Sequence, residues 1–235
     1  MLQLRDPGPQ SSGPQSSGPL IAAMVADLSP VAALRPSSGL IAGLAATALT
    51  TGVVALLFGW RADILAGHPS MLVVARSSVL LLGGGAMLLG AVLTALPGRD
   101  DRWASRAGGL LLGVLPLGLA ALAVCATVGD APLSFAAPLS FGEVGGLSAA
   151  RCLAISLGCA LLVAGAITLW LCRAAPTRLA RAGWLSGWAA GALGTFAYSL
   201  YCPSNTLEFA ATIYPAAVLL SAALSRLILP QLVRW

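Results

Sequence analysis

Long apolar segments separated by short polar connections make up most of the chain. Each segment is close to the roughly 20 residues that a helix needs to cross a hydrocarbon core of about 30 Å. The six segments cover approximately residues 40–60, 77–96, 107–128, 152–172, 183–201 and 209–229. The pattern therefore predicts an all-α integral membrane protein built as a six-transmembrane-helix bundle.

The fifth segment has one helical face made of glycine. Gly183, Gly187 and Gly191 recur every fourth residue, and a face without side chains lets a neighbouring helix approach closely inside lipid. We expect this face to pack within one bundle, and dimerisation is the alternative. Aromatic rings at the two ends of the segment are expected to mark the membrane boundaries: Trp184 and Trp188 at one, Tyr198 and Tyr201 at the other.

The residues before the first segment are of two kinds. Residues 1–19 contain a near-perfect GPQSS repeat, and this composition predicts a disordered extension because it cannot bury a core. Residues 20–38 predict a short amphipathic helix followed by a hinge at 35–38, and residues 39–235 form the transmembrane domain. A helix this short is marginal alone, so it needs a docking partner. Its apolar face consists of Leu20, Ile21, Met24, Val25 and Leu28.

Composition and charge fix the class of protein and its orientation. Hydrophobic residues make up 58% of the chain, charged residues 9%, and the mean hydropathy is +0.89, outside the range of soluble domains. All 13 basic residues are arginine, and no long basic run indicates nucleic-acid binding. Three lie in connections on one side: Arg61, Arg76 and Arg151. The other ten lie on the opposite side, which predicts that both termini are cytoplasmic.

Residues that would support transport or catalysis are missing. None of the six segments contains an Asp, Glu or His, whereas carriers usually place an ionisable group inside the membrane. The chain also lacks a nucleophile–base pair, a phosphate-binding loop and a His-x-x-x-His pair, so we expect that this protein is not an enzyme. A small transporter or channel subunit remains the alternative, with a path lined by Thr47, Thr50, Thr51 and Arg76.

Cysteine placement is the remaining chemical feature. Cys152 begins the fourth segment and Cys202 ends the fifth, and because consecutive spans are antiparallel, both should lie at the outer surface. Cys125 is near the same depth. Cys159 is about 10 Å deeper and Cys172 roughly 30 Å away, from a rise of about 1.5 Å per residue.

Several roles for Cys152 and Cys202 are open. Facing thiols on packed helices could act as a sensory or metal-responsive pair, or they could form a structural disulfide. The third alternative is that the two cysteines are unrelated small core residues. We expect no resident cofactor, although a soft metal ion could bind the two thiols transiently. A membrane thiol oxidoreductase is a further possibility, but the chain has no Cys-x-x-Cys pair. His68 is either a ligand at such a site or a solvated loop residue.

Several stretches resemble the NrsF-type family of bacterial membrane anti-sigma factors, the negative regulators of sigma F. The resemblance covers most of residues 20–235. Its strongest part is a succession of Ala-Pro-Thr, the glycine face and Tyr-x-x-Tyr-Cys-Pro, and Tyr201 stands where a histidine is more usual. The stretches are LIAAMVADLSPVAALRP, PGRDDRW, CRAAPTRLARAGWLSGWAAGALGTFAYSLYCPSNTLEF and the final Arg-Trp pair.

The resemblance implies a regulatory role. It implies that the cytoplasmic N-terminal segment holds an extracytoplasmic-function sigma factor at the bacterial inner membrane, and that Cys152 and Cys202 take part in sensing. Helix-in-groove docking would use the apolar face of residues 20–28. We expect a periplasmic metal or redox signal to change helix packing near the two cysteines and so release the sigma factor.

Overall fold

The computed structural model divides the chain into two units, Met1–Leu34 and Arg35–Trp235, and only Ala26 of the first is described. The predicted N-terminal extension and the apolar face of residues 20–28 therefore lie outside the described residues. In the second unit the structure describes residues 35–69, 71–96, 102–103, 105–110, 113, 143–144, 147–174, 176, 178–202 and 207–232.

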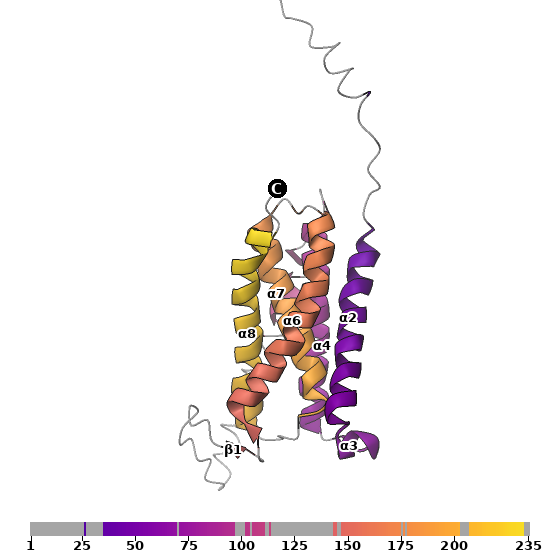
Figure 1. The fold of residues 1–235 in the computed structure, drawn as a ribbon, viewed down its shortest axis with the longest axis vertical. Coiled ribbons are helices and arrows are strands. Elements are labelled where there is room, and N and C mark those ends of the chain that lie inside the picture. Colours follow the sequence, from indigo (N-terminus) through magenta and orange to yellow (C-terminus); the bar gives the residue numbers. More distant parts are fainter. Residues whose placement is uncertain are drawn as a thin grey trace, which may run out of the picture. The chain divides into compact units, whose positions relative to one another are not determined.

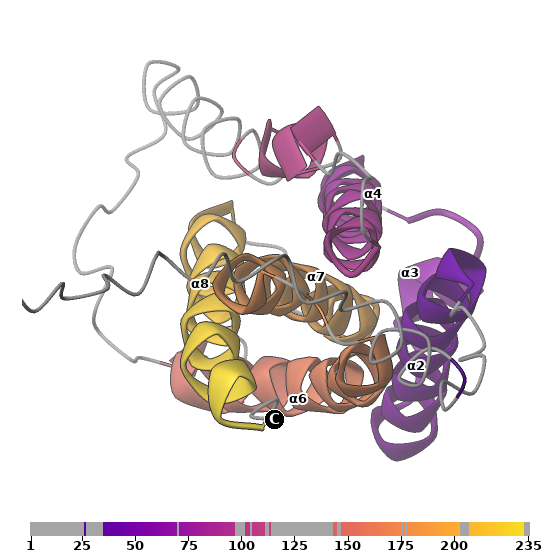
Figure 2. The same cartoon turned by 90° about the horizontal axis from the view of Figure 1, so that it is seen from above.

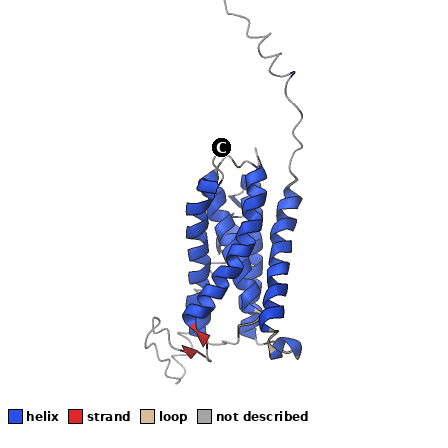
Figure 3. Cartoon of the chain, viewed as in Figure 1, coloured by secondary structure: helices blue, strands red, loops and turns tan. Residues whose placement is uncertain are grey.

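These residues are almost entirely helical (Figures 1 and 3). The helices are α2 (Pro36–Phe58), α3 (Ala62–Leu65), α4 (Met71–Thr94), α6 (Ala149–Ala174), α7 (Leu179–Ser199) and α8 (Leu207–Leu232). Two short strands, β1 (Glu143–Val144) and β2 (Leu147–Ser148), pair in antiparallel register, with Glu143 opposite Ser148. The prediction of an all-α architecture is confirmed apart from this hairpin.

Four of the helices contain stretches long and apolar enough to cross a membrane: Pro36–Phe58, Val73–Thr94, Ala150–Ala174 and Thr212–Leu232. These correspond to the first, second, fourth and sixth predicted segments. α7 corresponds to the fifth. Most of the third predicted segment, 107–128, lies outside the described residues; of it, residues 107–110 and 113 are described, and they are helical.

All five long helices begin before the segments that the sequence pattern predicts, and the starts of α2 and α4 change the interpretation of named residues. Residues 36–38, expected to belong to a hinge, form the first turn of α2. Pro36 occupies the first helical position, where its fixed φ suits a helix and its missing N–H is no loss. α4 begins at Met71 instead of residue 77, because the apolar run before Arg76 continues the helix. Arg76 is therefore inside a helix and not in a connection.

α7 is the central helix of the described bundle. Figure 2 shows it between α8, α6 and α4, and fifteen of its 21 residues are buried, so neighbours cover most of its surface. A helix this buried needs no strongly apolar outer face, which explains why α7 is less hydrophobic than the other long helices. Small residues are what permit such close packing from several directions.

The glycine face of α7 packs against α8. A Cβ added at Gly187 would be 2.6 Å from the Cα of Ala222, and one at Gly191 would be 2.9 Å from the Cα of Val218. At Gly183 the nearest atom is a backbone oxygen of α8, at 3.3 Å. The two backbones therefore approach so closely that no side chain fits between them. This contact lies within the bundle.

Glycine also brings α7 against its other neighbours. A Cβ at Gly194 would be 2.5 Å from the Cα of Ala160 in α6. On a third side, Gly84 of α4 leaves room for Leu193, whose side chain would be 2.9 Å from an added Cβ. The end of α7 is thereby fixed relative to both α6 and α4.

Substitution of the glycine face should weaken the bundle. We expect Gly187→Ala to lower the free energy of unfolding by about 1–3 kcal/mol, because the new methyl group overlaps the backbone of α8. Gly165→Ala in α6 is the matched control, since nothing lies within 4 Å of its added Cβ. Thermal unfolding of both purified variants in detergent provides the comparison, and equal stability of the two would contradict this packing.

Candidate functional site

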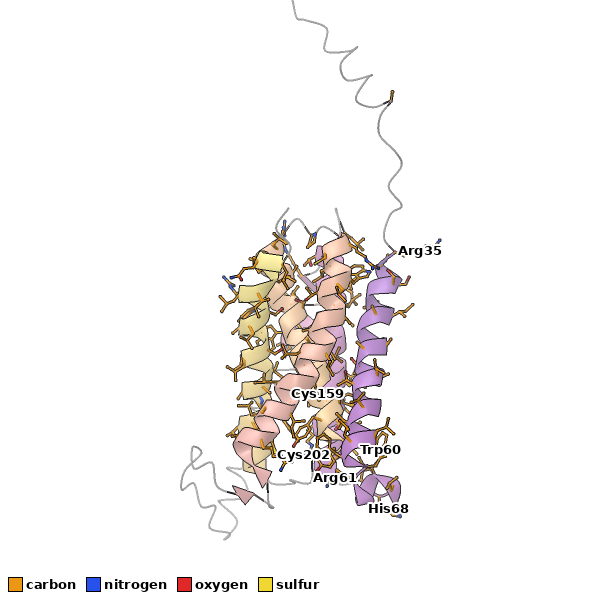
Figure 4. All side chains as sticks on the ribbon, in the orientation of Figure 1. Arg35, Trp60, Arg61, His68, Cys159 and Cys202 are labelled. Atoms are coloured by element: carbon orange, nitrogen blue, oxygen red, sulfur yellow. The ribbon has the colours of Figure 1, made fainter. Side chains whose placement is uncertain are left out.

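The two predicted cysteines meet at one end of the bundle. Cys152 lies in the first turn of α6, Cys202 lies three residues beyond the end of α7, and both are buried. Their thiols lie close enough to interact, and both are free. The pairing arises because α6 begins, and α7 ends, at the same end of the bundle. Figure 4 shows Cys202 at the end that carries Arg61, opposite Arg35.

Tyr198 connects the thiol pair to the core of α7. Its hydroxyl donates a hydrogen bond of 3.0 Å to the sulfur of Cys152, and its side chain is fully buried. Tyr198 lies near the end of α7, as the sequence indicated, but its ring packs inside the bundle. Burial of a phenol requires a partner for its O–H, and the Cys152 sulfur supplies one. Tyr201 is half-buried, with its ring centroid 5.9 Å from that of Tyr198.

A second tyrosine and an arginine complete the cluster. Tyr214 of α8 is fully buried, and its hydroxyl lies close to the Cys202 thiol. The guanidinium of Arg76 lies over the Tyr214 ring, 5.3 Å from its centroid, a cation–π arrangement. Arg76 also donates from Nη2 to the Ser199 carbonyl oxygen at 3.1 Å. α4, α6, α7 and α8 therefore all contribute to one buried polar site.

The position of Arg76 is a correction to the sequence interpretation. We expected Arg76 in a connection between helices, but it lies within α4 and its side chain is fully buried. A buried charge is tolerated only with hydrogen-bonding and electrostatic partners, and the Ser199 carbonyl and the Tyr214 ring supply them. The neighbouring hydroxyls of Ser77 and Ser199, 3.1 Å apart, add a second link between α4 and α7. The apolar residues that precede Arg76 were the sequence signal from which its place inside a helix could have been predicted.

The connection after α2 reaches the same site. Arg61 donates from Nη1 to the carbonyl oxygen of Cys202 at 2.6 Å. The ring of Phe58, at the end of α2, lies 4.8 Å from that of Tyr201. Two contacts thus join α2 to the residues that surround the thiols. Nothing in the spacing of the sequence indicated them, because the partners are about 140 residues apart.

The remaining cysteines do not join this pair. Cys159 is buried deeper in α6, Cys172 is half-buried near the other end of that helix, and Cys125 lies outside the described residues. His68 is exposed, and Figure 4 shows it beyond the end of α2, apart from Cys202. Within the part of the chain that the structure describes, no group of three or more His, Cys, Asp or Glu residues lies together.

The threonines expected to line a transport path interact mainly with their own helix. The hydroxyl of Thr47 donates to the carbonyl of Gly43, and that of Thr51 to the carbonyl of Thr47, both at 2.9 Å. Thr50 is buried. Such back-bonding satisfies a hydroxyl inside a helix bundle without any solute.

Neighbouring thiols provide two kinds of chemistry. A two-electron oxidant such as a peroxide can join the two sulfurs, and the thiols then lose two protons and two electrons. Two thiolates can instead ligate a soft metal ion. Either event would change the bonds that hold α6 and α7 together at this end of the bundle.

Oxidation should be selective for this pair. In membranes treated with hydrogen peroxide, we expect a Cys152–Cys202 disulfide, because their thiols are neighbours. Cys172 serves as the internal control, since it lies at the opposite end of α6. Peptide mass spectrometry without reduction detects each linkage. Random pairing that includes Cys172, or no Cys152–Cys202 product, would contradict the geometry.

Comparison with known proteins assigns the family. No curated protein and no solved structure matches the chain. The family model described as NrsF, negative regulator of sigma F, matches residues 24–235, nearly the whole chain. This protein therefore belongs to the NrsF family, the negative regulators of sigma F, and is a negative regulator of a sigma factor.

Proposed function

We propose that this protein is an anti-sigma factor that holds an extracytoplasmic-function sigma factor at the bacterial inner membrane and releases it when a signal acts at Cys152 and Cys202. Family membership supports the regulatory role. The observation that carries the sensing mechanism is the meeting of two buried thiols at one end of the bundle, opposite the end at which the N-terminal segment joins α2. A sensor and an output at opposite ends are what signalling across a membrane requires.

The arrangement of helices supports six spans with both termini on one side. α4 ends near the start of α2, whereas α6 begins at the opposite end of the bundle. The chain between them therefore joins opposite ends of the bundle, and the Ser105 hydroxyl near its start accepts from Nη2 of Arg181, at the start of α7, at 3.5 Å. Figure 1 also shows α2 beginning and α8 ending at the same end.

Arginine distribution supports the orientation. Arg35, Arg173, Arg178 and Arg181 lie at the end of the bundle where α2 begins, and positive charge favours the cytoplasmic side. Exposed Arg226 lies over the Trp184 ring, 5.7 Å from its centroid, near the same end. This distribution supports a cytoplasmic N-terminal segment, within reach of a sigma factor, and a periplasmic thiol pair.

The energy required of the signal is small. A tenfold drop in sigma-factor occupancy corresponds to about 1.4 kcal/mol of coupling between the two ends. Loss of one buried hydrogen bond, such as that from Tyr198 to Cys152, is worth a comparable amount. Oxidation of the thiols or capture of a soft metal ion would weaken this bond, because a disulfide draws the Cys152 sulfur toward Cys202 and a metal ion takes up a sulfur lone pair.

A small transporter is the second candidate, and one observation favours it. Arg76 is an ionisable residue buried in a candidate span, which is where transporters place the group that binds a substrate. Solute flux into proteoliposomes that is lost in Arg76→Gln would support that function. Flux equal to that of empty liposomes would exclude it.

Retention of the sigma factor should depend on the apolar face of residues 20–28. We expect full-length protein in nanodiscs to retain an extracytoplasmic-function sigma factor from a lysate, and Val25→Asp to abolish retention by placing a charge in the docking face. Ala26→Asp adds the same charge on the opposite face and should leave retention unchanged. Co-purification followed by mass spectrometry identifies the bound protein. If no sigma factor co-purifies with the unmodified chain, the proposed function is contradicted.

A further inference from the structure

α2 is the most loosely packed long helix among the described spans. In the most apolar 18-residue stretch of α2, 22% of the residues are buried, whereas in the corresponding stretch of α4 61% are buried. Its buried positions form a single narrow stripe: Gly39, Gly43, Thr47, Thr50 and Val54. Displacement of α2 therefore breaks fewer contacts than displacement of α4 or α7. Among the long helices that the structure describes, α2 therefore costs the least to move.

Hydrogen bonds attach α2 to the bundle at its two ends. At the start of the helix, Trp170 of α6 donates from Nε1 to the hydroxyl of Ser38 at 3.0 Å. Just beyond its last residue, Arg61 donates to the Cys202 carbonyl. Between these points, the hydroxyls of Thr47 and Thr51 bond to carbonyls of α2 itself. The polar attachments of α2 are therefore terminal, and one of them is at the thiol site.

A turn after α2 makes this attachment possible. Gly59 ends the helix with φ of 83°, a left-handed conformation that favours glycine, and its N–H bonds to the carbonyl of Ala55. The chain then returns toward α7, where Arg61 reaches Cys202. Phe58, the last residue of α2, packs on Tyr201 just before the turn.

We infer that Phe58 and Arg61 are positioning residues that couple the thiol pair to α2, and that α2 is the helix that carries the signal to the N-terminal segment. This inference rests on the proposed function. Two sets of contacts make the connection. One runs from Cys152 through Tyr198 and Tyr201 to Phe58, and the other from Cys202 directly to Arg61.

The coupling follows from what each contact senses. Modification of Cys152 displaces or occupies the sulfur that accepts from the Tyr198 hydroxyl and so disturbs the ring on which Tyr201 packs. Modification of Cys202 moves the backbone whose carbonyl accepts from Arg61. Both changes weaken the hold on the same end of α2. Because α2 continues at Arg35 into the N-terminal segment, a freed α2 alters the segment that would bind the sigma factor.

Hydrogen exchange of the full-length protein in nanodiscs tests the attachment without a sigma factor. In Arg61→Ala, amides of residues 54–58 should exchange about tenfold faster than in the unmodified chain, because the hydrogen bond that fixes this end is lost. Arg173→Ala is the control: it removes the same charge from an exposed arginine at the other end of the bundle. Equal exchange of residues 54–58 in Arg61→Ala and Arg173→Ala would overturn the inference.

A sigma-dependent reporter tests the coupling in cells. Arg61→Ala and Phe58→Ala should each raise the reporter signal in unstimulated cells. Diamide, a thiol oxidant, should raise the signal of these two variants little further. In Arg61→Lys, which keeps a hydrogen-bond donor, the reporter should remain repressed. Immunoblots of membranes show whether each variant is present at normal amounts. A full diamide response in Arg61→Ala would overturn the coupling. A reporter that stays unchanged when the whole gene is deleted would instead overturn the proposed function, whatever the exchange result.

Discussion

The close approach of α7 to its neighbours is the constraint on which the rest of the structure depends. Inside lipid, apolar side chains gain little by leaving their surroundings, so helix association relies on van der Waals contact between backbones. Gly187 and Gly191 provide that contact with α8, and Gly194 provides it with α6. A side chain at any of these positions would separate the helices. The end of α7 would then no longer be fixed.

The thiol site depends directly on this packing. Cys202 follows the last turn of α7, and Gly194, two turns before it, fixes that end against α6, which carries Cys152. Tyr198 and Tyr214 fill the space between the helices and place their hydroxyls beside the sulfurs. The site is therefore a product of helix packing.

Periodicity and composition predicted the elements but not their exact ends or their contacts. The apolar runs predicted the helices that became α2, α4, α6, α7 and α8, and antiparallel succession was enough to bring Cys152 and Cys202 to one end. Arg76 was misplaced because a charge was taken to end a span, whereas its partners on α7 and α8 make burial tolerable. Tyr198 lies near the end of α7, but its ring is buried inside the bundle. An aromatic ring near a helix end predicts a membrane boundary only when it faces lipid, and the facing direction depends on tertiary packing.

We propose that the chemical state of the Cys152 and Cys202 sulfurs controls release of the sigma factor. The most direct test is transcript profiling of two strains, one with the unmodified chain and one with the Cys152→Ser, Cys202→Ser double variant. Each strain is profiled untreated, with diamide and with Cd²⁺. A deletion strain defines the regulated genes. The account predicts that these genes respond to at least one of the two agents in the unmodified strain and to neither in the double variant. An equal response in the two strains would contradict it.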